Sequence, residues 1–207
     1  MQINSRREYN FSKLDLEDLP ANPVTAFENW LKDAETHQVP DYNAFHLATS
    51  NGSGHVSGRM VLLKSIENGR FIFYTDYESR KGQQIGINNY AAATFFWSQI
   101  ERQVRLEGTI SRLDTAKSDK YFQSRPLEAR AAAAVSRQSK RAESREALEQ
   151  RLELMMRQTE NIERPARWGG YAIEPHYVEF WQGRPNRLND RIVFEKRNEW
   201  LKYRLEP

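Results

Sequence analysis

The 207-residue chain contains no cysteine, few histidines and no long apolar run. Without cysteine it can have no disulfide, no thiolate nucleophile and no cysteine-ligated metal. The polar first residues and the absence of any run of roughly eighteen apolar residues favour a cytoplasmic protein over a secreted or membrane-spanning one. No metal site is expected, because the histidines show no metal-ligand spacing. They are His37, His46, His55 and His176.

Two familiar nucleotide-binding motifs are also missing, GxGxxG and GxxxxGK[ST], so the common dinucleotide and P-loop folds find no support. The 31 Lys and Arg residues against 28 Asp and Glu leave a net charge of only +3. With no basic stripe and no RNA-binding motif, nucleic acid is not an expected partner. Several arginines instead stand within apolar or aromatic sequence, where a desolvated guanidinium needs an anion. Phosphate-bearing small ligands are therefore the first candidates.

The residue pattern predicts short antiparallel strands, interrupted by helices. Helices are expected after the capping residues Asn22, Ser79 and Asp114, and over 129–134 and 145–158. Since strands at both ends of the chain enclose helices, we predict one α+β domain over residues 22–207, preceded by an arm over 1–21. The strand-like runs are 45–49, 59–64, 71–75, 92–97, 103–110, 170–173, 177–181, 190–194 and 199–205, with Asn-Gly turns at 51–52 and 68–69.

One candidate ligand site follows from the residues alone. Arg59 and Lys64 bracket an apolar strand, a pattern also typical of a strand with solvated ends. The next hairpin supplies Tyr74 and Thr75, and the segment 79–81 then places Ser, Arg and Lys at a helix start. Hydroxyls, cations and free N–H groups at a helix N-terminus form a natural phosphate cradle.

A series of short motifs, in order along the chain, resembles the pyridoxamine 5′-phosphate oxidase family. The resemblance runs from Arg6-Arg-Glu-Tyr9 to Arg204-Leu-Glu-Pro207 and so covers nearly the whole chain. The other motifs are Arg59-Met-Val-Leu-Leu-Lys64, Phe73-Tyr-Thr75, Ser79-Arg-Lys-Gly82, Glu101-Arg-Gln-Val104, Tyr121-Phe-Gln-Ser-Arg-Pro126, Gln138-Ser139, Phe180-Trp-Gln-Gly183 and Arg187-Leu-Asn-Asp-Arg191.

The resemblance implies an antiparallel FMN-binding split β-barrel with flanking helices, and a homodimer whose C-terminal strands take part in dimerisation. It further implies oxidation of pyridoxamine or pyridoxine 5′-phosphate to pyridoxal 5′-phosphate, with O2 reduced to H2O2 and no metal. The implied FMN-binding residues are Arg59, Met60, Val61, Leu62, Leu63, Lys64, Tyr74, Thr75, Arg80, Lys81, Gln103, Gln138, Ser139, Trp181 and Arg191. The implied substrate-binding residues are Arg6, Arg7, Tyr9, Lys64, Tyr121, Arg125, Arg187 and Asn189, of which Arg187 and Asn189 are the expected catalytic pair.

Two positions depart from the family pattern. Ala129 replaces a serine that would give the substrate phosphate another hydroxyl, and Asn189 replaces a histidine. Asparagine can form hydrogen bonds but cannot become cationic near neutral pH. Weakened or altered turnover is therefore expected. Two alternatives stay open: a related flavin oxidase of another pathway such as phenazine biosynthesis, and a catalytically weakened protein that only binds FMN or pyridoxal phosphate.

Overall fold

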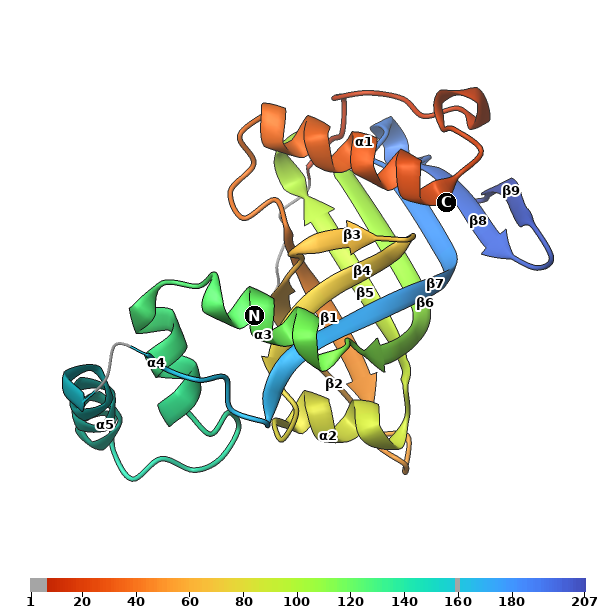
Figure 1. The fold of residues 1–207 in the computed structure, drawn as a ribbon. Coiled ribbons are helices and arrows are strands. Elements are labelled where there is room, and N and C mark those ends of the chain that lie inside the picture. The colour runs from red at the N-terminus through yellow and green to blue at the C-terminus, as the bar shows by residue number, and fades with distance from the viewer. Residues whose placement is uncertain (1–6, 159–160) are drawn as a thin grey trace.

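The computed structural model describes residues 7–158 and 161–207, and its centre is a curled antiparallel sheet (Figure 1). The strands follow the order β2-β1-β5-β6-β7-β4-β3, with β8 and β9 added beside β7. This confirms the predicted α+β class with an antiparallel split barrel. The strands are β1 (Ala44–Ser50), β2 (Val56–Leu62), β3 (Ser65–Glu67), β4 (Arg70–Asp76), β5 (Tyr90–Trp97), β6 (Arg102–Arg112), β7 (Trp168–Gln182), β8 (Asp190–Lys196) and β9 (Trp200–Leu205).

The long strand β7 belongs to two parts of the sheet. Its first half pairs with β4 and its second half pairs with β8, while β6 runs beside most of its length. The register shifts at Gly108, which faces Pro175, and His176 is the extra residue. A proline is tolerated in a strand at such an irregularity. The sequence predicted two strands here, at 170–173 and 177–181, and the structure joins them into one.

Five helices lie around the barrel, and their starts follow the predicted caps. Asn22 Oδ1 accepts from Val24 N at 2.8 Å, Ser79 Oγ from Gly82 N at 3.3 Å, and Asp114 Oδ1 from Ala116 N at 2.8 Å. Such caps satisfy N–H groups that have no partner within the helix. The helices are α1 (Pro23–Thr36), α2 (Arg80–Ile87), α3 (Thr115–Gln123), α4 (Leu127–Val135) and α5 (Arg145–Gln158).

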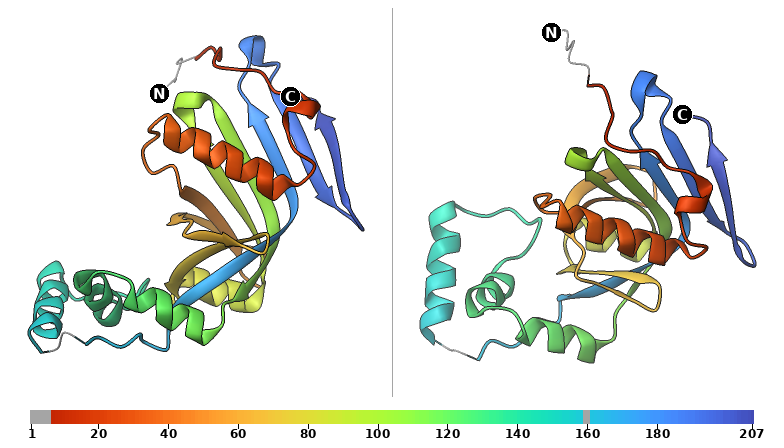
Figure 2. Two further views of the ribbon diagram at one scale, coloured as in Figure 1. Left: turned by 45° about the horizontal axis from the view of Figure 1, so that its top comes forward. Right: turned by 90° about the horizontal axis from the view of Figure 1, so that it is seen from above.

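Helices α1 and α2 lie at opposite ends of the barrel, and α4 and α5 stand to one side beyond α3 (Figures 1 and 2). The β8–β9 hairpin projects at the end that α1 covers. In the part of the chain that the structure describes, no helix is both long enough and apolar enough to span a membrane.

Aromatic side chains fill the barrel. Phe27 of α1 meets Phe71 and Phe95 edge-on, with ring centroids 4.9 and 4.8 Å apart, and Phe45 lies 5.0 Å from Phe95. These rings are fully buried, and edge-on contacts add to the free energy gained by burying them. A second, smaller core joins α3, α4 and the start of β7 around Phe122 and Trp168. The two cores position two different groups of polar residues, described below.

The outward face of β2 is apolar. Val56, Met60 and Leu62 alternate along the strand and are 68%, 62% and 42% exposed, and Phe96 of β5 is 54% exposed. Each residue of β2 pairs only with β1, so the strand is an edge of the sheet. Exposed apolar side chains gathered on one face of a sheet are typical of a surface that binds a partner or a ligand.

Candidate active site

Three cations meet at the start of α2. Lys81 is 7% exposed, and its ammonium donates to Thr75 Oγ1 at 3.1 Å and to Gln138 Oε1 at 2.6 Å. Burial and the nearby Arg59 lower the pKa of Lys81 to about 8. Burial and the nearby Arg80 likewise lower the pKa of Arg59. Arg59, Arg80 and Lys81, here called the cation cluster, therefore repel one another; Lys81 is buried, Arg59 is half-buried and Arg80 is exposed.

Neutral oxygens hold the Arg59 guanidinium in place. It donates to Leu47 O at 3.1 Å, to Thr49 Oγ1 at 2.7 Å and to Ser57 Oγ at 2.6 Å. Gln84 Oε1 accepts from both of those hydroxyls, at 2.6 and 2.8 Å. Within the described ranges, no carboxylate lies within ion-pair distance of any member of the cation cluster. A bound anion would supply the missing negative charge.

The turn after α4 lies against the cation cluster. Ser139 Oγ accepts from Arg80 N at 3.2 Å, while Gln138 Oε1 accepts from both Thr75 and Lys81. Ser139 has a φ of 71°, in the left-handed region. The structure thus brings together six of the predicted FMN-binding residues, which come from three separate stretches of the chain. They are Arg59, Thr75, Arg80, Lys81, Gln138 and Ser139.

A second group surrounds an aromatic stack between β4, α3 and β7. Tyr74 and Tyr121 stack with centroids 3.8 Å apart, and Trp168 lies nearly parallel to both. The Arg125 guanidinium lies 4.8 Å from the Trp168 ring centroid. Its buried Nη1 has no hydrogen-bond partner among the described residues, and burial lowers its pKa. A desolvated guanidinium with an unused donor is suited to bind an anion.

The adjoining pocket carries net positive charge. It has a volume of about 400 Å³, and its lining includes Lys64, Lys117 and Lys120 together with Tyr74 and Tyr121. Its one acidic lining residue, Glu67, accepts from Lys117 at 2.6 Å. Burial raises the pKa of Tyr74 to about 12 and raises that of Tyr121, so both hydroxyls stay protonated and can donate to an anion.

Tyr74 and Lys64 are placed differently from the simplest sequence interpretation. Tyr74 was grouped with the FMN residues, but its ring joins the Tyr121 stack while its neighbour Thr75 faces Lys81. Strand β2 ends at Leu62, so Lys64 follows the strand instead of closing it as predicted. The reason is that the chain crosses to β4 here: Leu63 N donates to Asn43 O and Lys64 N to Ile72 O.

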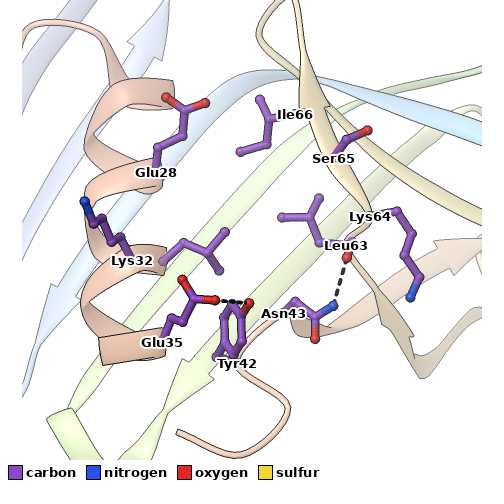
Figure 3. A pocket seen from close by; sticks show the side chains of 10 residues that line it. Glu28, Lys32, Glu35, Tyr42, Asn43, Leu63, Lys64, Ser65 and Ile66 are labelled. Atoms are coloured by element: carbon purple, nitrogen blue, oxygen red, sulfur yellow. Dashed lines mark hydrogen bonds between the residues drawn. The ribbon is translucent and has the colours of Figure 1, made fainter. Parts of the chain in front are cut away.

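A groove between α1 and β3 lies beside Lys64 (Figure 3). Its volume is about 450 Å³, and Figure 3 shows Glu28 and Glu35 on the α1 side, with Lys64 across from them. Tyr42 donates to Glu35 Oε1 at 2.7 Å. The two carboxylates balance the ammonium groups of Lys32 and Lys64, so this groove has no net positive charge, whereas the aromatic pocket has.

The third group lies at the opposite end of the barrel. A pocket of about 530 Å³ there is lined by residues 7–9 of the arm together with Arg184, Asn186, Arg187 and Asn189. Arg187 is exposed with a φ of 62°, and Asn189 Oδ1 accepts from Arg184 N at 3.0 Å. The predicted substrate residue Arg6 lies outside the described residues.

The arm is held against the body by short-range contacts. The buried carboxylate of Glu101 accepts from Arg7 at 3.3 Å and from Phe11 N at 2.8 Å. Tyr9 meets Trp181 edge-on at 5.4 Å and covers Gly183, where an added Cβ would lie 2.6 Å from the Tyr9 ring. The segment over 184–189 and the arm therefore form one surface.

Three predicted FMN residues also belong to this end. Gln103, Trp181 and Arg191 are opposite one another across β6, β7 and β8. Arg191 donates to Glu179 at 2.9 and 3.1 Å, and Glu179 is 2% exposed. Their chain neighbours Arg102 and Phe180 contact Trp30 of α1, whereas the cation cluster lies at the start of α2. Helices α1 and α2 are at opposite ends of the barrel (Figures 1 and 2). A single chain does not bring the two halves of the predicted site together.

Comparison with known proteins identifies the family. A family model described as pyridoxamine 5′-phosphate oxidase matches residues 31–156. The chain belongs to this family. A curated pyridoxine/pyridoxamine 5′-phosphate oxidase from Paraburkholderia phymatum is 44% identical over 205 residues, covering 98% of this chain and 97% of that protein. One from Cytophaga hutchinsonii is also 44% identical, over 98% of this chain and 96% of that protein.

A second family model and two solved structures extend the comparison. The model, described as the pyridoxine 5′-phosphate oxidase C-terminal dimerisation region, matches residues 168–207. The crystal structure of PhzG from Burkholderia lata, in complex with tetrahydrophenazine-1-carboxylic acid, has a TM-score of 0.91 at 30% identity, covering 97% of this chain and 100% of that one. An FMN-binding protein of Nostoc punctiforme, described as related to pyridoxamine 5′-phosphate oxidase, has a TM-score of 0.74 at 17% identity, covering 91% and 100%.

Several residues of the oxidase fold escaped the sequence interpretation. Thr49, Ser57 and Gln84 hold Arg59, but single polar residues in a strand or helix carry no signal of such a role. Trp168 is buried, and it is also the ring over which Arg125 lies.

The lowered pKa of Lys81 predicts a pH-dependent cost in the ligand-free oxidase. Below about pH 8 the charged ammonium destabilises the folded state, and this cost disappears between the folded pKa of about 8 and the ordinary value of 10.5. We expect Lys81→Met to be more stable than the wild type at pH 7, with the difference shrinking towards pH 10. Urea unfolding at several pH values between 7 and 10 measures this difference in the free energy of unfolding, and Lys140→Met, at an exposed position, is the control. A difference independent of pH would contradict the assignment.

Proposed function

We propose that this oxidase binds FMN and uses it to convert pyridoxamine or pyridoxine 5′-phosphate to pyridoxal 5′-phosphate, with O2 reduced to H2O2. The observation that carries the proposal is the presence of two separate groups of cations without enough negative charge: the cation cluster, and Arg125 with the lysine-lined pocket beside the aromatic stack. One phosphate on the cofactor and one on the substrate would balance them. The family match, and the FMN binding described for the Nostoc punctiforme relative, support the cofactor.

The cation cluster fits the FMN phosphate. Arg59 and Lys81 are already held by neutral oxygens and need no movement to face an anion, and Arg80 adds a third positive charge at the helix start. The Gln138–Ser139 turn would cover the phosphate from outside. The residues that follow Arg59 along β2 and just beyond it, Met60 to Leu63, would lie along the flavin ring.

The aromatic pocket fits the substrate phosphate. The unused donor of Arg125, the ammonium of Lys64 and the protonated hydroxyl of Tyr121 would converge on it. Ala129 supplies no further hydroxyl. The proposed role of Arg187 and Asn189 is to hold the pyridine ring, with Arg7 and Tyr9 of the arm closing over it.

We propose a homodimer as the working form, because within one chain the two halves of the site lie at opposite ends of the barrel, near α1 and near α2. A second copy would bring its Arg187 and Asn189, together with Gln103, Trp181 and Arg191, to the cation cluster of the first. The match to the C-terminal dimerisation region supports this arrangement. The apolar outward face of β2 supports it too, since dimerisation would remove those side chains from water.

The chemistry would depend mainly on positioning. When bound, FMN accepts two electrons from the substrate carbon and passes them to O2. The chain's own residues would fix both phosphates, so that the reacting carbon is held near the flavin without a nucleophile or a metal. The arm, held by Glu101, would exclude water from the ring.

The chief alternative is an oxidase acting on a bulky aromatic acid, as the bound ligand of PhzG suggests. Two observations favour the vitamin B6 phosphates instead. The chain is 44% identical to pyridoxine/pyridoxamine 5′-phosphate oxidases but 30% identical to PhzG. In addition, Lys64 and Tyr121 line a pocket whose charge suits a phosphate, and Arg125 has an unused donor beside the adjoining aromatic stack.

Flavin binding and turnover test the proposal. The purified protein should be yellow and should release H2O2 with pyridoxamine 5′-phosphate. Arg80→Glu should weaken FMN binding by about a hundredfold or more, because a lost charge-assisted contact is replaced by repulsion. Fluorescence titration measures the affinity, with the exposed Arg151→Glu on α5 as a control of equal charge change. Unaltered FMN affinity in Arg80→Glu would show that the phosphate does not bind at this site. A colourless, inactive wild type would refute the proposed function.

Asn189 predicts a gain of activity by substitution. An imidazole can carry charge beside an anionic substrate, whereas an amide cannot. We expect Asn189→His to raise kcat/KM for pyridoxamine 5′-phosphate by about tenfold, as one added charge-assisted hydrogen bond would. FMN affinity should stay unchanged, and Asn186→His on the same surface should have no effect. Peroxide assays at several pH values decide the matter, and equal kcat/KM in both proteins would place residue 189 away from the substrate.

A further inference from the structure

We propose that Arg167 is a positioning residue for the cofactor phosphate: with Asp76 it fixes the Gln138–Ser139 turn against the cation cluster. The inference rests on the proposed function and adds to it a residue that lies outside the predicted site. Arg167 stands immediately before β7, in the segment that follows α5. It is mostly buried, with 17% of its side chain exposed.

The guanidinium of Arg167 binds the end of α4. Its Nη2 donates to Ala133 O at 3.1 Å, to Ala134 O at 2.7 Å and to Ser136 O at 2.9 Å. The last carbonyls of a helix have no partner within it and carry partial negative charge, which a cation stabilises. Ser136 lies two residues before Gln138, so this contact fixes the point from which the turn departs.

The same side chain reaches Asp76. Arg167 Nε lies 3.1 Å from Asp76 Oδ2, and this carboxylate side chain is 5% exposed. The other oxygen, Oδ1, accepts from Glu78 N at 2.7 Å, and Asp76 O accepts from Ser79 N and from the Ser79 hydroxyl. Asp76 therefore organises the backbone that leads into α2. Arg167 connects that backbone to the end of α4.

The two anchored backbones converge on the proposed phosphate site. One carries Arg80 and Lys81 and the other carries Gln138 and Ser139, and they are joined by the contacts Lys81–Gln138 at 2.6 Å and Arg80 N–Ser139 at 3.2 Å. Mutual repulsion within the cation cluster opposes this arrangement in the absence of an anion. Arg167 binds the carbonyls at the end of α4 and forms an ion pair with Asp76, whose carboxylate in turn binds the backbone that leads into α2, so this side chain resists that repulsion.

The experiment compares FMN with riboflavin, which lacks the phosphate. Arg167→Met should lower FMN affinity about tenfold, the size expected when a charge-assisted hydrogen bond is lost, while riboflavin affinity stays the same. Arg167→Lys keeps a positive charge near Asp76 but cannot also donate to three carbonyls. Its FMN affinity should therefore lie between that of Arg167→Met and that of the wild type. Fluorescence titration of the full-length proteins gives both affinities.

Arg164→Met is the matched control. Arg164 precedes the same strand, is similarly buried, and donates to Trp168 O at 2.6 Å and to Asp119 at 2.6 Å, but reaches neither α2 nor the turn. It should leave the FMN to riboflavin affinity ratio unchanged. Equal losses for both flavins in Arg167→Met would mean that Arg167 only stabilises the fold, and no loss for either would also overturn the inference. A wild type that binds FMN no better than riboflavin would instead refute the phosphate site of the proposed function.

Discussion

Repulsion among three neighbouring cations, of which Lys81 is buried, is the constraint on which the proposed site depends. Neutral hydroxyl, amide and carbonyl oxygens hold Arg59 and Lys81, and among the described residues no carboxylate lies within ion-pair distance of the cluster. Burial, followed by the neighbouring cations, lowers the pKa values of Arg59 and Lys81, while the more distant Asp76 offsets this only in part at Lys81. Folding therefore stores unfavourable electrostatic energy at the start of α2, and an anion releases it. Affinity for a phosphate follows from this more directly than from any single hydrogen bond.

The strand β7 gives this site its geometry. Its first half pairs with β4 and completes the barrel. At that end Arg167 forms an ion pair with Asp76, and Arg125 lies over the Trp168 ring. Its second half carries Trp181 and pairs with β8, beside the arm and Asn189. Because one strand spans both regions, the two halves of the proposed site are kept apart within a chain. A second copy related by twofold symmetry could bring complementary halves together twice.

Much of the fold could be predicted from the sequence. The three capping residues marked where helices begin, since Asn, Ser and Asp side chains satisfy N–H groups locally. Short runs rich in β-branched and aromatic residues, bounded in part by Asn-Gly turns, located eight of the strands, because such residues favour strands. The strand β3 was missed, being only three residues long, and the irregular register at His176 made β7 read as two strands.

The candidate site was less accessible to sequence reasoning. Arg59, Arg80 and Lys81 were found because clustered cations at a helix start are a local pattern. Tyr74 was grouped with the FMN residues on the family resemblance; its ring joins the Tyr121 stack, whereas its strand neighbour Thr75 faces Lys81. Arg167 and Asp76 are far apart in the chain and meet only through the pairing of β4 with β7, so no local pattern could reveal them.

Subunit complementation tests most directly whether two chains build one site. Arg80→Glu and Arg187→Glu alter opposite ends of the barrel, and each variant alone should release little H2O2 with pyridoxamine 5′-phosphate. When the two are unfolded together and refolded with FMN, random pairing should place both intact halves in about one site in four, restoring roughly a quarter of the wild-type activity. No recovery in the refolded mixture, with wild-type protein regaining activity in the same procedure, would contradict a site shared between two chains.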